Sequence, residues 1–269
     1  MISSISGRQA LVYEDEGVSF SSAEALVQQL QNILGPSITV KKVNSAYLAN
    51  EPWEDKTDVV AMGGGKCSLW EVQLGDKGML KIHQYVLRGG KYIGFCAGAY
   101  FGASKSYFQV GDLPPIIKSR PLFFFEGEAT GPLWGDEDYL APKSARAAQI
   151  HFRKGDMTLQ GKLYYQGGCY FEVPAQSSSV EVLGTYAGLP EALPAVILCR
   201  VGQGMAFLCG PHPEFAWSQS LKGKGVSGDL VNELAPEEEF RHQFWQQIGE
   251  SLCLKVISVK IKLDILKTT

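Results

Sequence analysis

The sequence predicts an α/β fold whose mostly parallel sheet is extended by antiparallel strands, and three observations predict it. Short apolar runs alternate with amphipathic helical stretches in the first half of the chain. Two of these runs lead directly into glycine-rich or small-residue segments, as strands do at the edge of a sheet. The second half carries strand-like runs joined by tight turns. Alternation of this kind forms βαβ units, and tight turns add antiparallel strands.

The first half is expected to alternate strand and helix. Ser21 and Glu24 have the spacing of a capping box, which predicts the start of the first helix. Its apolar face is formed by Leu26, Leu30, Ile33 and Leu34, and Gly35-Pro36 ends it. The strands expected here are 10–13, Ile38–Val43, 58–62 and Lys91–Phe95, and a second helix is expected at about 77–88.

The second half is less regular. Prolines interrupt the pattern between about 105 and 152, where 122–125 is the only strand candidate. Further strands are expected at 162–165, Val180–Tyr186, 195–201 and 205–209, with a hairpin turn at 202–203. A last helix begins near Pro236 and buries Phe240, Phe244, Ile248 and Leu252.

We expect one domain over residues 1–252 and a C-terminal tail over 253–269. The tail alternates apolar and polar residues from Val259 to Ile265, which fits either an additional strand or a disordered end.

The composition is that of an ordinary globular protein. Hydrophobic residues make up 45% of the 269 residues and charged residues 20%, which excludes a fibrous or disordered chain. A net charge of -3 without a Lys/Arg cluster argues against a nucleic-acid partner. We expect no membrane span and no secretory signal. The six cysteines show no CxxC or zinc-ligand spacing, so we expect a cytoplasmic protein with no metal and no cofactor.

Gly94-Phe95-Cys96-Ala97-Gly98 is the most informative segment. A nucleophile placed between a buried strand and a helix sits on a tight, strained turn that only small neighbours tolerate. The neighbours of Cys96 are small, and the following helix would stabilise its thiolate. The alternative is a packed strand end with an inert, buried cysteine.

The Gly63-Gly64-Gly65 segment follows the preceding expected strand. In an open α/β sheet, ligands bind at the carboxyl ends of the strands. We therefore expect the glycine amides, with the amide of Ala97, to face a developing oxyanion. A plain flexible turn is the alternative interpretation.

His212 and Glu214 follow a late apolar strand, within Gly210-Pro211-His212-Pro213-Glu214-Phe215. Alternate side chains of an extended segment point the same way, so the carboxylate can orient the imidazole. A thiol nucleophile needs such a base, and the base needs such a partner. A proline-rich surface turn is the alternative. The joint occurrence of the three segments favours a triad of Cys96, His212 and Glu214.

These segments also carry a family resemblance over about 10–252. GFCAGAY followed by HPE resembles the class I glutamine amidotransferases, which implies a flavodoxin-like three-layer fold and a Cys-His-Glu triad. The sequence is still more similar to the amidotransferase-like N-terminal domain of fungal-type biotin–protein ligases. The segments that carry this resemblance are Glu51-Pro52-Trp53, Gly63-Gly64-Gly65, GFCAGAYFG from Gly94, YQGGCYF from Tyr165 and GPHPEF from Gly210.

The resemblance implies roles for particular residues. Cys96 would be the nucleophile, His212 the base and Glu214 its partner, with the amides of Gly64, Gly65 and Ala97 in the oxyanion hole. Tyr100, Gln166 and Gly167 would contact the substrate. Tyr100 stands where ordinary glutaminases carry a glutamine that holds their substrate, and we expect no ammonia-accepting synthetase domain within these 269 residues.

Three functions remain open at this stage. The first is an amidase or acyl transferase that acts on a small amide through a Cys96 thioester. The second is a silent regulatory or binding module that contacts a biotin–protein ligase or its carrier protein. The third is a cysteine hydrolase or peptidase-like relative. The chain has no loop of the form G-R-G-R-x-G, so we do not expect it to form biotinyl-AMP alone.

Overall fold

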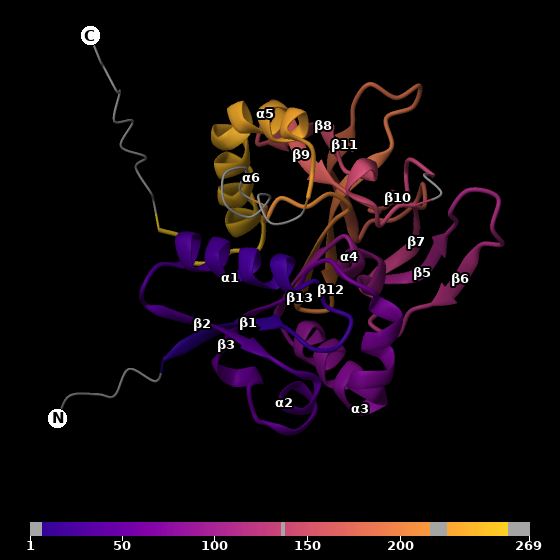
Figure 1. Ribbon diagram of the computed structural model, residues 1–269. Helices are drawn as coiled ribbons and strands as arrows, with labels where there is room; N and C mark the ends of the chain where they lie inside the picture. Colours follow the sequence, from indigo (N-terminus) through magenta and orange to yellow (C-terminus); the bar gives the residue numbers. More distant parts are fainter. Residues whose placement is uncertain (1–6, 136–137, 216–224, 258–269) are drawn as a thin grey trace, which may run out of the picture.

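A computed structural model describes residues 7–135, 138–215 and 225–257 (Figure 1). Within these residues, a nine-stranded sheet has the order β2-β1-β3-β4-β13-β12-β11-β8-β9. Its first five strands are parallel and the others pair antiparallel. The strands are β1 Arg8–Tyr13, β2 Ile38–Val43, β3 Thr57–Met62, β4 Lys91–Phe95, β8 Arg146–Lys154, β9 Met157–Tyr165, β11 Val180–Tyr186, β12 Pro194–Val201 and β13 Gly204–Cys209. The expected mixture of parallel and added antiparallel strands is confirmed.

Helices cover both faces of this sheet and give it three layers (Figure 1). Alternate residues of β1 point to opposite faces, so Ala10 and Val12 pack with α1 and α6 while Leu11 and Tyr13 pack with α3. In Figure 1, α1, α5 and α6 lie on one side and α2 and α3 on the other. The helices are α1 Phe20–Leu34, α2 Ser45–Asn50, α3 Cys67–Leu87, α4 Ala97–Gly102, α5 Gly228–Leu234 and α6 Glu238–Ser251.

Helix α1 does not begin with the expected capping box. Its N-cap is Ser19, which makes no side-chain capping bond, so the helix starts ahead of Ser21. The next residue, Ser22, is fully buried and points into the protein. The end of the helix agrees with the prediction, since Gly35 has φ 69° there.

Two other elements differ from expectation. Helix α3 begins at Cys67 rather than near residue 77, and Gly75, with φ 56°, interrupts it. The strand expected at 122–125 is wrong, because Phe123 has φ 50° and strand β7 begins only at Phe125. The alternating tail from Val259 to Ile265 lies outside the described residues.

A second, smaller sheet was not anticipated. Within the described residues, it has four strands in the order β10-β7-β5-β6. They lie beside the end of the large sheet in Figure 1. Its strands are β5 Ala103–Phe108, β6 Ile116–Ser119, β7 Phe125–Gly131 and β10 Tyr170–Glu172. This sheet forms one wall of the cavity described below.

Three adjacent parallel strands position the chemistry-bearing segments. Strand β4 pairs with β3 on one side and with β13 on the other. Their carboxyl ends therefore bring the glycine loop, Cys96 and the His212 loop to one edge of the sheet. The amide of Cys96 donates to the carbonyl of Cys209 at 3.0 Å, which ties the end of β4 to the end of β13.

Candidate active site

Cys96 lies between β4 and α4 in a strained backbone conformation. Its φ of 49° and ψ of -108° fall in a region that side-chain-bearing residues rarely occupy. This turn lifts the thiol out of the sheet to the wall of a cavity, although only 8% of the residue is exposed. The geometry agrees with the tight strand-to-helix turn that the sequence predicts.

Two glycines permit the close packing around this turn. A Cβ on Gly98 would lie 2.1 Å from the backbone oxygen of Met62. A Cβ on Gly64 would lie 2.7 Å from Cε1 of His212. Real Cβ atoms do not approach other atoms this closely, so both positions exclude every larger residue without a shift of the neighbouring chain.

The His212 loop is held from several directions. The amide of His212 donates to the carbonyl of Tyr164 at 2.8 Å. Its imidazole packs against the rings of Tyr164 and Phe215. From α6, the indole N–H of Trp245 donates to the carbonyl of Pro213 at 2.9 Å. The ring therefore has one defined place beside Gly64.

A buried hydrogen-bonded chain runs through this ring. Nδ1 of His212 lies 2.7 Å from Oε1 of Glu214, and the ring lines the same cavity as Cys96, whose side chain raises the pKa of the imidazole. Since one ring nitrogen faces the carboxylate, Nε2 is the nitrogen that remains for the thiol. Glu214 is fully buried and His212 is 5% exposed. The structure thus brings together all three residues of the expected triad.

Ser22 adds a further member to this series of hydrogen-bonded side chains, and the sequence did not predict it. Its hydroxyl donates to Oε1 of Glu214 at 2.6 Å and accepts from the amide of Gly64 at 2.8 Å. Ser22 and Glu214 are 192 positions apart, and no local pattern marks the serine. It connects the carboxylate to the glycine loop and so orients Glu214.

Burial and two neighbouring side chains together set the pKa of His212. Burial lowers its pKa, but the charges of Glu214 and Cys96 and hydrogen bonds to both residues raise it, to about 10. A raised pKa favours the protonated form of the imidazole at neutral pH. A protonated imidazole beside a thiolate is the arrangement of an activated cysteine.

The expected oxyanion donors need one correction. The amide of Gly64 already donates to Ser22, so it is not available to a substrate. The amides of Gly65 and Ala97 make no hydrogen bond among the described residues, and both residues line the cavity. These two amides are the donors that remain available to a developing oxyanion.

The cavity beside Cys96 has a volume of about 430 Å³, which is sufficient for a small organic substrate. Tyr100, Gln166 and Gly167, the residues expected to contact the substrate, all line it. The hydroxyl of Tyr100 donates to the carbonyl of Gly167 at 3.3 Å, and the carbonyl of Gln166 accepts from the Cys96 thiol at 3.6 Å. The side-chain amide of Gln166 instead donates to the carbonyls of Leu140 and Ala141, so it positions that segment.

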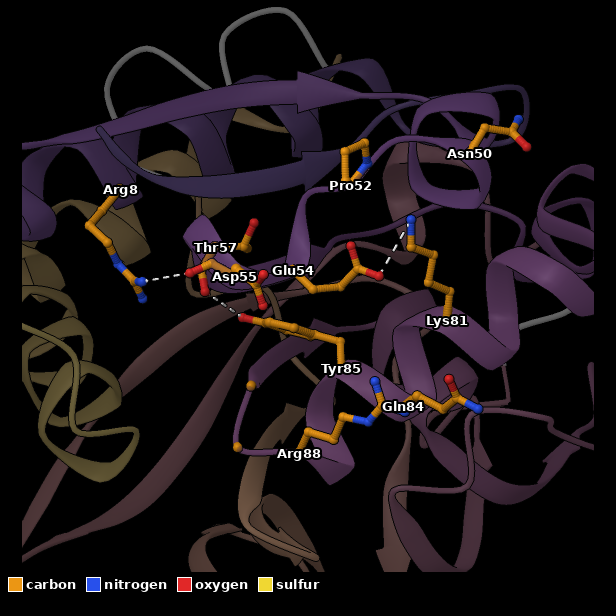
Figure 2. A pocket seen from close by; sticks show the side chains of 12 residues that line it. Arg8, Asn50, Pro52, Glu54, Asp55, Thr57, Lys81, Gln84, Tyr85 and Arg88 are labelled. Carbon is orange, nitrogen blue, oxygen red and sulfur yellow. Dashed lines mark hydrogen bonds and ion pairs between the residues drawn. The ribbon is translucent and has the colours of Figure 1, made fainter. Parts of the chain in front are cut away.

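A second cavity, of about 600 Å³, opens at the opposite edge of the parallel strands (Figure 2). Its lining includes charged side chains of both signs. Figure 2 shows Arg8 bonded to the carbonyl of Asp55, and Lys81 facing Glu54 at 3.4 Å. It contains no cysteine or histidine, which places the candidate chemistry in the cavity beside Cys96.

Neither a metal cluster nor a membrane span is found in the described part of the chain. No group of three or more His, Cys, Asp or Glu side chains could hold a metal ion there. Over the same residues, no helix combines the length and the apolar character needed to cross a bilayer.

Comparison with known proteins decides the family. The profile of the family described as "Biotin-protein ligase, N terminal" matches residues 8–267. The chain belongs to this family. The resemblance stated from the sequence is thereby confirmed.

The relatives of this biotin–protein ligase N-terminal chain differ in length. A biotin–protein ligase of Schizosaccharomyces pombe is 31% identical over 209 residues, which are 77% of this chain and 33% of that ligase. This chain therefore spans only a third of the ligase. A Chlamydia muridarum protein, described as uncharacterized, is 34% identical over 241 residues and is matched over 92% of its own length. Among solved structures, a cytoplasmic protein of Salmonella typhimurium has the same fold, with a TM-score of 0.50 at 10% identity over 91% of this chain and 99% of that one.

Ser22→Ala tests whether the serine orients Glu214. The substitution leaves the buried amide of Gly64 without an acceptor and Glu214 without one donor, so we expect a loss of about 2 kcal/mol in unfolding free energy. The alkylation rate of Cys96 should fall by roughly tenfold. Urea unfolding and mass-resolved alkylation measure the two effects. Ser21→Ala, on the same turn, is the control; equal effects of both variants would contradict this role.

Proposed function

We propose that Cys96, His212 and Glu214 act as a triad that transfers or hydrolyses the acyl group of a small amide. The observation that carries the proposal is the position of His212, which is hydrogen-bonded to Glu214 and lines the same cavity as Cys96. The strained turn at Cys96 supports it, because such strain recurs at nucleophiles.

The proposed reaction follows from this arrangement. The Cys96 thiolate attacks the amide carbonyl, and the amides of Gly65 and Ala97 donate to the resulting oxyanion. His212 gives its proton to the leaving nitrogen, so that the carbon–nitrogen bond breaks and a thioester remains. The neutral imidazole then takes a proton from water, whose attack releases the carboxylic acid and restores the thiolate beside the protonated ring. Glu214 keeps the ring oriented and stabilises its charged form.

Alkylation of Cys96 tests the proposal directly. Iodoacetamide should modify Cys96 at neutral pH at least about tenfold faster than it modifies N-acetylcysteine. Intact mass and peptide mapping locate the label in a Cys253→Ser background, since Cys253 is an exposed thiol. Burial raises the pKa of the Cys67 thiol to about 11, so this second thiol of the cavity should react slowly. A Cys96 that reacts no faster than N-acetylcysteine would refute the triad.

Turnover requires a separate measurement. Ammonia release from a panel of primary amides, glutamine among them, would identify an amidase, and Cys96→Ser should abolish it. A peptide panel distinguishes the peptidase-like alternative.

A regulatory module associated with biotin–protein ligase is the second candidate. It is favoured by the similarity to the S. pombe ligase, of which the matched region is a third. This function predicts that the chain binds a biotin–protein ligase or its carrier protein in a pull-down, and that Cys96→Ser leaves this binding intact. Fast alkylation combined with ammonia release would instead favour the enzyme.

A further inference from the structure

The cavity beside Cys96 is bordered by cations. Lys66 follows the glycine loop, Lys118 belongs to β6, and Arg120 comes directly after that strand. Among the described residues, no aspartate or glutamate lines this cavity. Its charge is therefore suited to an anion, whereas the lining of the cavity in Figure 2 also includes the acids Glu54 and Asp55.

Arg120 is built into the cavity wall. It is 6% exposed, and its Nε donates to the hydroxyl of Ser106 at 2.9 Å. Its guanidinium also pairs with Glu71, whose other oxygen lies 3.6 Å from the amine of Lys118. The carboxylate of Glu71 thus pairs with both Arg120 and Lys118, and Glu71 does not line the cavity. Arg120, Lys118 and Glu71 together carry one net positive charge, and Lys66 adds a second.

The same cavity also offers apolar contact. Phe108, Ile116 and Leu140 line it, and the last two are 55% and 72% exposed. Exposed apolar side chains at a cavity mouth gain from being covered by an apolar part of a ligand. A ligand that reaches Cys96 would pass these residues and the cations together.

We propose that this cavity selects amides whose acyl part carries an anionic group, a carboxylate or a phosphate, on an apolar stem. Lys66, Lys118 and Arg120 determine this specificity. The inference rests on the proposed function of Cys96 and names the substrate class of that site. Two or more cations facing an anion at a partly screened surface favour it over a neutral analogue by about tenfold.

Two matched electrophiles test the proposal. N-iodoacetyl-β-alanine is anionic and N-iodoacetyl-β-alaninamide is its neutral counterpart. The ratio of their alkylation rates at Cys96, divided by the same ratio for N-acetylcysteine, should be about ten and should decrease at high salt. N-iodoacetyl-aminoethyl phosphate forms a third arm. A higher rate for either anionic probe supports the proposal, and the faster one identifies a carboxylate or a phosphate.

Variants assign the preference to the cations. Lys118→Gln and Lys66→Gln should each lower the normalised ratio by roughly threefold, and the double variant should bring it close to one. Lys91→Gln changes the net charge equally at the opposite edge of the sheet and should leave the ratio unchanged. These surface substitutions avoid the buried Arg120.

The outcomes separate this inference from the proposed function. A ratio equal to that of N-acetylcysteine, with both probes reacting fast at Cys96, overturns the anionic substrate class alone. Rates at Cys96 no higher than those of N-acetylcysteine for every probe overturn the proposed function and this inference with it.

Discussion

His212→Ala is expected to slow the alkylation of Cys96 by roughly 100-fold or more. Removal of the ring takes away the cation that stabilises the thiolate and the group that moves the proton, and such groups contribute about 10²–10⁴-fold. The rate is measured at neutral pH with a neutral electrophile, followed by intact mass. A His212→Ala protein that reacts as fast as the wild type would show that the imidazole has no part in activating the thiol.

The same substitution should also destabilise the protein. It leaves the fully buried Glu214 without its cation, and breaking a buried pair in this way costs about 3–5 kcal/mol. The remaining hydrogen bond from Ser22 places the expected loss at the lower end of this range. The double variant His212→Ala/Glu214→Gln removes the unpaired charge. We expect it to recover much of the unfolding free energy but none of the reactivity, which separates the chemical role from the structural one.

The pH dependence of stability supplies an independent check on the pair. Because the folded-state pKa of His212 is raised from 6.5 to about 10, its stabilising contribution is complete below pH 6.5. It is lost as the pH rises through about 10. The stability difference between the wild type and the double variant should therefore narrow towards high pH. If the difference in unfolding free energy does not change with pH, the charge of the His212 ring does not contribute to stability.

The parallel half of the fold could be predicted because its strands are short and most of them contain an apolar run next to glycines. Strands β2 and β4 begin and end where the sequence analysis placed them, and β13 is one residue longer. Parallel strands share one carboxyl edge, so the segments that follow them had to meet. The order of the strands along the chain and their apolar pattern were therefore enough to predict which distant segments come together.

The second sheet and Ser22 could not be predicted, for different physical reasons. Strand β6 lies at a sheet edge, follows two prolines and has no buried face, so it lacks the alternation that marks a strand. In β5, the buried positions include Ser106, which serves Arg120 rather than an apolar core. The function of Ser22 depends on a partner 192 positions away, and its neighbours Ser21 and Glu24 resembled a cap instead. Two of the three cations of the cavity, Lys118 and Arg120, belong to or directly follow this unanticipated strand β6.

Gly98→Ala is expected to impair both stability and reactivity. Helix propensity alone would favour alanine by up to about 1 kcal/mol at this position. The added Cβ would lie 2.1 Å from the backbone oxygen of Met62, and backbone at the end of a central strand cannot move aside as a flexible side chain can. Overpacking of this kind costs about 1–3 kcal/mol, so the clash wins over propensity.

The consequence for the site follows from one hydrogen bond. The amide of Gly98 donates to the carbonyl of Gly63 at 2.9 Å and joins the start of α4 to the glycine loop. A shift of α4 would therefore move Cys96 relative to His212, so we expect a loss of about 2 kcal/mol in unfolding free energy and roughly tenfold slower alkylation. Gly228→Ala is the matched control, since a Cβ there meets nothing within 4 Å at the start of α5. If Gly98→Ala behaves like this control in urea unfolding and in alkylation, the strand-to-helix turn is not the element that places the thiol.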